Sequence, residues 1–167
     1  MSKLTGLALS IAVLGGVWAF LALGPLAGIV LVWAGFIAWG CYFALGADNA
    51  ALQKTIVGMI YGAVIAGVAL ALVGANPLGL AGAVGPAIYI AVTVFLLVIV
   101  ANIPLLSAVP ANVYGYAATA AYALQTANAG SVTAMDLTNP VLLVALSTVL
   151  GAIFGMLSGK LAGILGK

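Results

Sequence analysis

The sequence predicts an all-α membrane protein with six transmembrane helices, and three observations lead to this fold class. Of the 167 residues, 66% are hydrophobic and 4% are charged, too few charged side chains to cover a water-soluble domain of this length. The apolar residues fall into six long runs. The lysines all lie on one side of the membrane when the chain crosses it six times.

The six runs have about the length that crosses a bilayer. About 20 apolar residues in a helix span the hydrocarbon core of roughly 30 Å. Lipid offers the backbone no hydrogen-bond partner, so the spans must be helices, and the runs lack the alternation of a β-barrel. We expect one transmembrane domain over residues 1–167, with spans at residues 4–23, 27–45, 55–73, 82–101, 105–124 and 141–161.

Each run has a recognisable boundary. Lys3 precedes the first run, which is longer than the apolar region of a signal peptide, so we expect a retained first helix. The second and third runs end at the turn-forming stretches GADN and GANP. The fourth ends before Pro104, the fifth contains Pro110, and the polar stretch QTANAGSVTAMDLTNP precedes the sixth.

The charged residues predict the orientation. With the N-terminus inside, Lys3, Lys54, Lys160 and Lys167 all fall in the cytoplasm, and Asp136 falls outside. This agrees with the excess of lysine and arginine that cytoplasmic loops carry. A five-span or seven-span topology would place some of these lysines outside. We therefore expect both termini in the cytoplasm.

The two halves of the chain share a series of short motifs in the same order. IAV occurs at 11–13 and again at 90–92, and a Pro-Leu pair follows 14 residues after the isoleucine each time. AGFIAWGCYFAL then corresponds to ANVYGYAATAAY, which aligns Gly35 with Asn112 and Trp39 with Tyr116. GMIYG in the first half corresponds to GAIFG in the second.

These matches have two interpretations. Apolar sequence repeats by chance, and each match is short. A true duplication of residues 5–74 as residues 82–163 would have a physical consequence, because a unit with three spans reverses its direction when it is copied. The halves would then form a 3+3 inverted repeat, and many transporters place their solute site at the interface of such repeats.

The stretch VPANVYGYAATAAYAL, residues 109–124, carries the candidate functional residues. Pro104 and Pro110 each remove a backbone donor, and the carbonyl groups so freed must meet protein or water. One interpretation is a broken or re-entrant segment that lines a solute path. The other is a proline-kinked helix with interhelical hydrogen bonds. On the first interpretation the path residues are Asn112, Tyr116, Tyr114, Thr119, Trp39 and Gly35.

Trp39 enters that set because it belongs to an aromatic cluster in the second run. The cluster comprises Trp33, Phe36, Trp39, Tyr42 and Phe43. It suggests either a constriction that excludes ions or ordinary core packing, with an interfacial belt as a further alternative for the last two. The repeat would place Trp39 opposite Tyr116.

Regularly spaced glycines predict close helix packing. A glycine every four residues gives a smooth helix face along which another backbone can approach. We expect this face to join the third and sixth spans, or to join subunits of a homo-oligomer. The packing residues are Gly58, Gly62, Gly151, Gly155 and Gly159.

Enzymatic chemistry is poorly supported. The chain has no histidine, and its two carboxylates, Asp48 and Asp136, fall in predicted loops on opposite sides of the membrane. No general base or metal ligand accompanies a nucleophile in the sequence. We interpret the single cysteine, Cys41, as a small core residue. We therefore expect no catalytic residue, metal or cofactor. We interpret Asp48 with Lys54 as an ion pair that caps the third span. Asn76-Pro77 and Asn139-Pro140 are typical helix starts.

Three stretches resemble a bacterial inner-membrane family known as domain of unknown function 1097. They are WAGFIAWGCYFALG, the segment 54–62, and VPANVYGYAATAAYA. Asn112 and Tyr114 stand where that family is expected to have more apolar or aromatic residues. The resemblance implies a single-domain protein of the bacterial inner membrane and implies no settled activity.

Two functions from different classes remain. The first is a channel or facilitator for a small uncharged solute of the urea, amide, ammonia or gas type, because ion-coupled transport usually keeps a carboxylate within the membrane. The alternative is a scaffold or accessory subunit of a larger complex. A proton-coupled exporter would need Asp48 or Asp136 inside the membrane. We expect the lipid bilayer, further copies of the chain and a small neutral solute as partners, and no nucleic acid.

Overall fold

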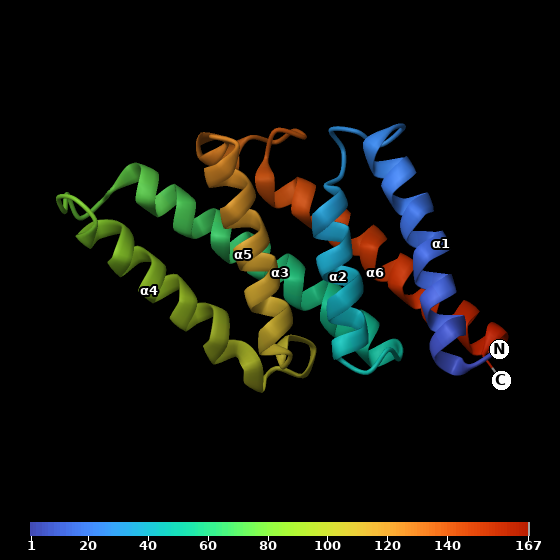
Figure 1. Cartoon of the computed structure of the whole chain (residues 1–167). Helices are drawn as coiled ribbons and strands as arrows, with labels where there is room; N and C mark the ends of the chain where they lie inside the picture. The colour runs from blue at the N-terminus through green and yellow to red at the C-terminus, as the bar shows by residue number, and fades with distance from the viewer. Residues whose placement is uncertain (167) are drawn as a thin grey trace.

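The computed structural model describes residues 1–166, which form six α-helices joined by turns and short 3-10 segments (Figure 1). The prediction of an all-α protein is confirmed for these residues, which contain no β-strand. The helices are α1 (Lys3–Leu23), α2 (Val32–Ala44), α3 (Asn49–Ala75), α4 (Val84–Ile99), α5 (Val109–Gln125) and α6 (Pro140–Leu165). The 3-10 segments are η1 (Val100–Asn102), η2 (Pro104–Leu106) and η3 (Ala129–Thr133).

Side-chain caps fix the starts of three helices. Ser2, Asp48 and Asn139 each accept a hydrogen bond from a backbone N–H in the first turn of α1, α3 and α6. Asp48 makes its cap directly, by accepting from the backbone N–H of Ala51 at 2.6 Å. Asn76 was predicted to begin a helix, but it does not. It ends α3 in the left-handed conformation, with φ 42°, because the following proline cannot continue the helix.

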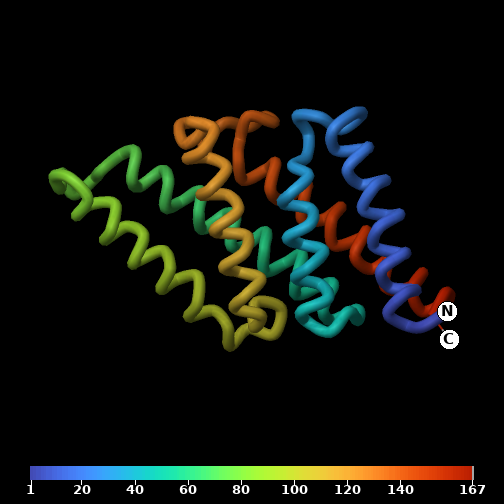
Figure 2. Tube along the Cα trace, viewed as in Figure 1, coloured from blue at the N-terminus to red at the C-terminus, as the bar shows by residue number. Residues whose placement is uncertain are grey.

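The helices run alternately between two edges of the molecule (Figures 1 and 2). α1 and α3 begin, and α6 ends, at the same edge. The two chain ends lie side by side there, since a Cβ added to Gly6 would lie 2.9 Å from the backbone nitrogen of Gly166.

Four segments are long and apolar enough to cross a membrane: Lys3–Leu23, Asn49–Ala75, Val84–Asn102 and Pro140–Leu165. They make the chain a multi-pass membrane protein. α3 and α6, with 27 and 26 residues, cross the molecule obliquely (Figure 1), which is how helices longer than the bilayer are accommodated. α2 and α5 have only 13 and 17 residues, fewer than the roughly 20 that span the hydrocarbon core.

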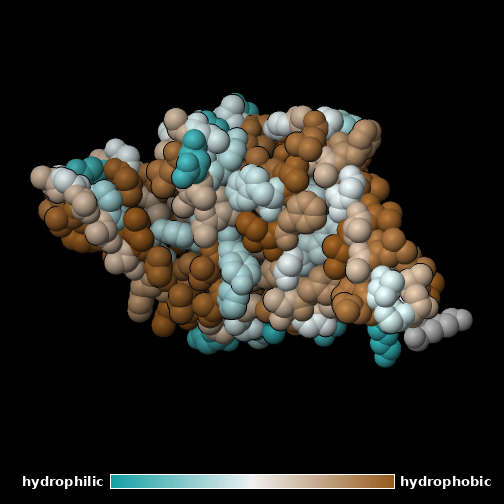
Figure 3. All heavy atoms as spheres, viewed as in Figure 1, coloured by the Kyte–Doolittle hydropathy of each residue, from teal (hydrophilic) through white to brown (hydrophobic). Residues whose placement is uncertain are grey.

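The helices form two layers with two flanking members. α5 packs on α3, and α2 packs on α6, while α4 lies against α3 and α1 lies against α6. Alanines and glycines fill most of these interfaces, so the backbones approach closely. Large aliphatic and aromatic side chains are instead exposed, and Figure 3 shows them covering much of the flanks, with hydrophilic residues gathered at the two edges. This distribution suits a lipid environment.

The second and fifth helices begin later than predicted. Residues 24–31 form turns, with Gly28 at φ 78°, so α2 begins at Val32 and not at residue 27. The predicted segment 105–124 is broken by proline as expected, but the break precedes Pro110. Pro110 stands in the first turn of α5, where its missing N–H costs nothing.

Candidate functional site between the two short helices

Both short helices follow a stretch of irregular backbone, and these stretches lie at opposite edges of the molecule (Figure 1). Such backbone must find hydrogen-bond partners within the protein if it lies at membrane depth. At the start of α2, the hydroxyl of Ser147 accepts from the N–H of Leu31 at 2.8 Å. The indole N–H of Trp18 donates to the carbonyl of Val32 at 2.9 Å.

Asn112 satisfies the backbone at the start of α5. Its Nδ2 donates to the carbonyl of Leu106 at 3.0 Å and to that of Leu97 at 3.2 Å. Pro110 has no N–H to offer to Leu106, so the Asn112 amide takes over the bond that the proline removes. Asn112 is fully buried, and among residues 1–166 its Oδ1 has no hydrogen-bond partner. A Cβ on Gly58 would lie 2.8 Å from that oxygen.

Tyr116 ties α5 to α4. The hydroxyl of Thr93 donates to the carbonyl of Tyr89 at 2.9 Å, which leaves its oxygen to accept from the Tyr116 hydroxyl at 3.1 Å. Thr119, two turns after Asn112 on α5, is fully buried, and so is Thr148 of α6. Neither threonine hydroxyl has a partner among the described residues.

Trp39 and Gly35 lie in the other interface. The indole N–H of Trp39 donates to the hydroxyl of Ser158 at 3.0 Å, and its ring stacks on Phe36 with 5.6 Å between ring centroids. Gly35 lies directly against the ring of Trp18 and the backbone of α6 at Gly151. A side chain at position 35 would collide with the Trp18 ring, and one at position 151 would collide with the backbone of Gly35.

The predicted path residues therefore divide between separate interfaces. Gly35 and Trp39 face α1 and α6, whereas Asn112 and Tyr116 face α3 and α4. We expected the two pairs to face each other across a path, but in the structure they do not. The reason is that each short helix packs on the long helix of the opposite half.

The glycines of the predicted packing set occupy these same contacts. Gly62 lies against the backbone of α5 at Asn112 and Tyr116, and Gly151 lies against α2. A Cβ on Gly155 would lie 3.1 Å from the Trp39 ring, and one on Gly159 would lie 3.8 Å from Phe43. These glycines thus lie against the short helices. The helices α3 and α6 do contact each other, but the glycines of the predicted set are not what joins them.

Two predicted path residues line hollows: Tyr116 lines a cleft of about 220 Å³ between α3, α4 and α5, and Tyr114 lines a larger one. Tyr114 is the one that lies between the short helices. It is 40% exposed and lines a groove of about 630 Å³ between α2 and α5. Trp33 and Phe36 form part of the opposite wall, and small residues such as Gly40 and Ala117 form much of the rest. None of the lining residues is charged.

The groove continues toward the end of α5. A second hollow of about 260 Å³ shares Trp33 and Ala121 with the first and adds Tyr122, Gln125 and Thr126. Figure 3 shows weakly polar residues gathered over α5 and α2 on the face toward the viewer, between apolar flanks. The two short helices thus frame one uncharged groove with a polar end.

The residues that hold the short helices in place were not among those predicted from the sequence. Ser147, Ser158 and Thr93 provide hydroxyls to α2 and α5, and Trp18 provides its indole N–H. The available signal was a single hydroxyl within an otherwise apolar helix, a residue type known to bond across helices in membranes.

Comparison with known proteins gives one family. The family model described as "Protein of unknown function (DUF1097)" matches residues 8–163. The search of curated proteins and the search of solved structures each return no match.

Proposed function

The chain belongs to the DUF1097 family of proteins of unknown function, and we propose from its geometry that it is a channel or facilitator for a small uncharged solute. The solute class is that of urea, simple amides, ammonia or dissolved gases, and the membrane is the bacterial inner membrane. The observation that carries this proposal is the uncharged groove between the two short helices.

The proposed topology has six crossings. The irregular segments before α2 and α5 complete the crossings that the helices alone are too short to make. The edge at which α1 and α3 begin and α6 ends carries Lys3, Lys54 and Lys160, so it is assigned to the cytoplasm. A cysteine introduced at Gly130 of a Cys41→Ser protein then reacts with an impermeant thiol reagent only from outside. Reaction only from the cytoplasm would refute this topology.

The helix contacts support an inverted repeat. Exchanging α1 with α4, α2 with α5 and α3 with α6 converts each main helix contact into another that exists: α2 on α6 becomes α5 on α3, and α1 on α6 becomes α4 on α3. Residue contacts follow the same exchange, since Gly151 meets Gly35 and Gly155 meets Trp39. In the other half the corresponding contacts are Gly58 with Asn112 and Gly62 with Tyr116. These are the pairs that the sequence motifs align.

The repeat gives the groove a defined place. Its two walls, α2 and α5, are the helices that the repeat exchanges, so the groove lies at the repeat interface where transporters often bind their solute. Tyr114 offers a hydroxyl and Gln125 an amide, while Trp33 and Phe36 offer apolar walls. Such a lining accepts a neutral solute and offers no counter-charge to an ion. Asn112, Tyr116, Thr119, Trp39 and Gly35 then position the two walls.

A second copy of the chain is proposed to close the groove. Tyr114 and Trp33 are each 40% exposed on this face, and Gln125 lines its outer end. Polar atoms facing hydrocarbon are costly, so the face is better covered by protein than by lipid. The homo-oligomer proposed here thereby encloses the path.

Flux through reconstituted protein tests the function. Proteoliposome swelling with a panel of neutral solutes is expected to exceed that of empty liposomes for at least one of them. Gly40→Phe fills the groove and is expected to abolish that flux. Gly16→Phe is the matched control, because both positions are exposed helix glycines with no described atom within 4 Å of an added Cβ, and Gly16 lies outside the groove.

Two outcomes would refute the channel. If no solute of the panel permeates faster than through empty liposomes, the scaffold alternative takes its place. The groove between α2 and α5 would then receive a helix of another protein. If a solute permeates but Gly40→Phe and Gly16→Phe conduct equally, the path lies elsewhere in the molecule.

A further inference from the structure

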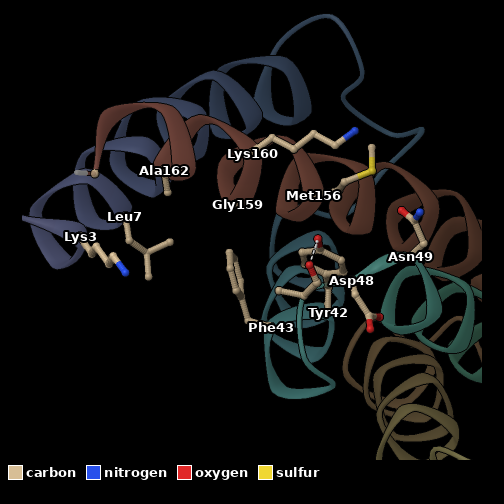
Figure 4. A pocket seen from close by; sticks show the side chains of 13 residues that line it. Lys3, Leu7, Tyr42, Phe43, Asp48, Asn49, Met156, Gly159, Lys160 and Ala162 are labelled. Atoms are coloured by element: carbon tan, nitrogen blue, oxygen red, sulfur yellow. Dashed lines mark hydrogen bonds between the residues drawn. The ribbon is translucent and has the colours of Figure 1, made fainter.

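We propose that a second hollow, the cleft between α1, α2 and α6, binds an anionic phospholipid. The cleft has a volume of about 540 Å³ and lies at the edge where α1 begins and α6 ends (Figures 1 and 4). The lipid headgroup lies at the rim of the cleft, which carries Lys3 at one end and Lys160 at the other, and an acyl chain follows the apolar part of the cleft.

The lining divides into a charged rim and an apolar floor. Lys3 comes from the first turn of α1, Lys160 from the last turns of α6, and Asp48 and Asn49 from the start of α3 (Figure 4). The turn that carries Asp48 is held by the Tyr42 hydroxyl, which donates to the carbonyl of Ala47 at 2.6 Å. The apolar lining consists of Leu7, Phe43, Met156, Gly159, Ala162, Gly163 and Gly166.

The charge of the rim selects an anion. Two lysines and one aspartate leave a net charge of +1. Asp48 already accepts the backbone N–H of Ala51, so its carboxylate is engaged in capping α3. A phospholipid with one net negative charge, such as phosphatidylglycerol, complements this rim. A zwitterionic lipid has no net charge and would leave the positive charge of the rim uncompensated.

The position of the cleft favours a lipid over a soluble anion. Both lysines are exposed, at the ends of apolar helices, where their long stems can follow the helix surface while the ammonium groups reach the headgroups. Basic pockets between transmembrane helices are known to bind lipid headgroups. The apolar lining beneath the rim would be exposed to water only if no acyl chain occupied it.

The other half of the molecule contains the corresponding cleft without the charge. This comparison rests on the repeat proposed above. The cleft between α3, α4 and α5 has about 220 Å³ and carries no charged residue. Its lining matches that of the first cleft through the pairs Leu7 and Pro86, Phe43 and Ala120, Gly159 and Ala66, Ala162 and Ala69, and Gly163 and Leu70. Gly67 aligns with Lys160 but is buried against Val141 of α6, so the charge of the first cleft has no counterpart in the second.

Lipid titration of the purified protein in a neutral detergent tests the proposal. Native mass spectrometry is expected to show phosphatidylglycerol binding more tightly than phosphatidylcholine or phosphatidylethanolamine. Lys3→Gln and Lys160→Gln are each expected to weaken it about fivefold. Lys54→Gln, at the same edge but outside the cleft, is the matched control and is expected to bind like the unaltered protein.

A second pair of variants tests the acyl chain. Gly163→Phe fills the apolar floor and leaves the lysines in place, so it is expected to lose the preference for phosphatidylglycerol. Gly74→Phe is its control, because each glycine has no described atom within 4 Å of an added Cβ and Gly74 lines neither cleft.

Four results would overturn the proposal. They are equal binding of phosphatidylcholine or phosphatidylethanolamine, an equal loss in Lys54→Gln, unchanged binding in Gly163→Phe, and displacement of the lipid by glycerol phosphate at the same concentration. The last result would show a soluble phosphate site. Since no solute flux enters these measurements, their failure is distinct from failure of the channel.

Discussion

The half formed by α1–α3 and the half formed by α4–α6 hold their short helices by different chemistry. In the first half, Gly35 leaves space for the fully buried Trp18, whose indole N–H bonds the backbone at the start of α2. In the second half, Asn112 stands where Gly35 would be and bonds the carbonyls of Leu97 and Leu106. A large ring from the flanking helix is thus replaced by an amide from the short helix.

The difference shows that the position of a short helix does not depend on one kind of contact. Both solutions fill the gap between a short and a flanking helix, and both satisfy irregular backbone. They differ in cost, because Asn112 leaves one buried oxygen without a partner among residues 1–166, whereas the indole has only the donor that it uses. The contacts that hold α5 should therefore be more sensitive to substitution than those that hold α2.

The largest expected effect is at the glycines, and it differs between the glycine that contacts α5 and the one that contacts α2. Gly62→Leu places a side chain against the backbone of α5, which cannot move aside, and is expected to lower the free energy of unfolding by about 3 kcal/mol or more. A Cβ on Gly155 would lie 3.1 Å from the Trp39 ring and 3.2 Å from the Tyr42 ring, a milder conflict, so Gly155→Leu is expected to cost about 1–3 kcal/mol. Unfolding in mixed micelles measures both. Equal costs would contradict the asymmetry.

The next effect is at Asn112. Asn112→Leu removes the donor for two buried carbonyls and is expected to cost about 2 kcal/mol in the free energy of unfolding. Leucine has the same branching as asparagine and is larger, so no cavity forms and any further loss comes from crowding. A variant as stable as the unaltered protein would show that these carbonyls find other donors.

A smaller effect is expected at the corresponding contact of the first half. Trp18→Phe removes one hydrogen bond, that to the carbonyl of Val32, and keeps much of the ring packing. The expected cost is about 1 kcal/mol in the same unfolding measurement, less than that of Asn112→Leu. If Trp18→Phe proves the more damaging, packing outweighs hydrogen bonding in both halves.

The smallest effect is expected at Thr119. Its hydroxyl has no partner within the described chain, so Thr119→Val is expected to change the free energy of unfolding by less than about 0.5 kcal/mol, or to raise it. Thr93→Val is the matched comparison, because it removes the bond to Tyr116 and is expected to cost about 1 kcal/mol. A large loss in Thr119→Val would reveal a partner, such as a bound water.

The sequence predicted the positions of the helices better than the contacts between them. The apolar runs identify α1, α3 and α6, because run length and hydropathy are local properties. The start of α2 was missed because the turns at residues 24–31 are themselves apolar. The four-residue spacing of glycines predicts a close approach, but the helix that approaches is set by the tertiary arrangement.

The candidate site was predictable to a similar degree. Asn112 stands out in the sequence as an amide within an apolar helix, and the proline before it predicts a free carbonyl nearby. Its second acceptor, the carbonyl of Leu97, comes from a different helix, and its complete burial depends on Gly58. Residues that are distant in the sequence therefore decide whether a polar side chain lines a solute path or bonds the backbone at a break in a helix.

The adjacency of the two chain ends makes the molecule a natural subject for circular permutation. A Cβ on Gly166 would lie 2.9 Å from the Cα of Lys3, so a few added residues can join the ends. Cutting the link between α3 and α4 would then yield a chain that begins with α4 and preserves every helix contact. Its new termini lie at the opposite edge of the molecule, outside the cell in the proposed topology. Such a permutant separates two influences that the natural chain combines, namely the order in which helices enter the membrane and the contacts that they finally make.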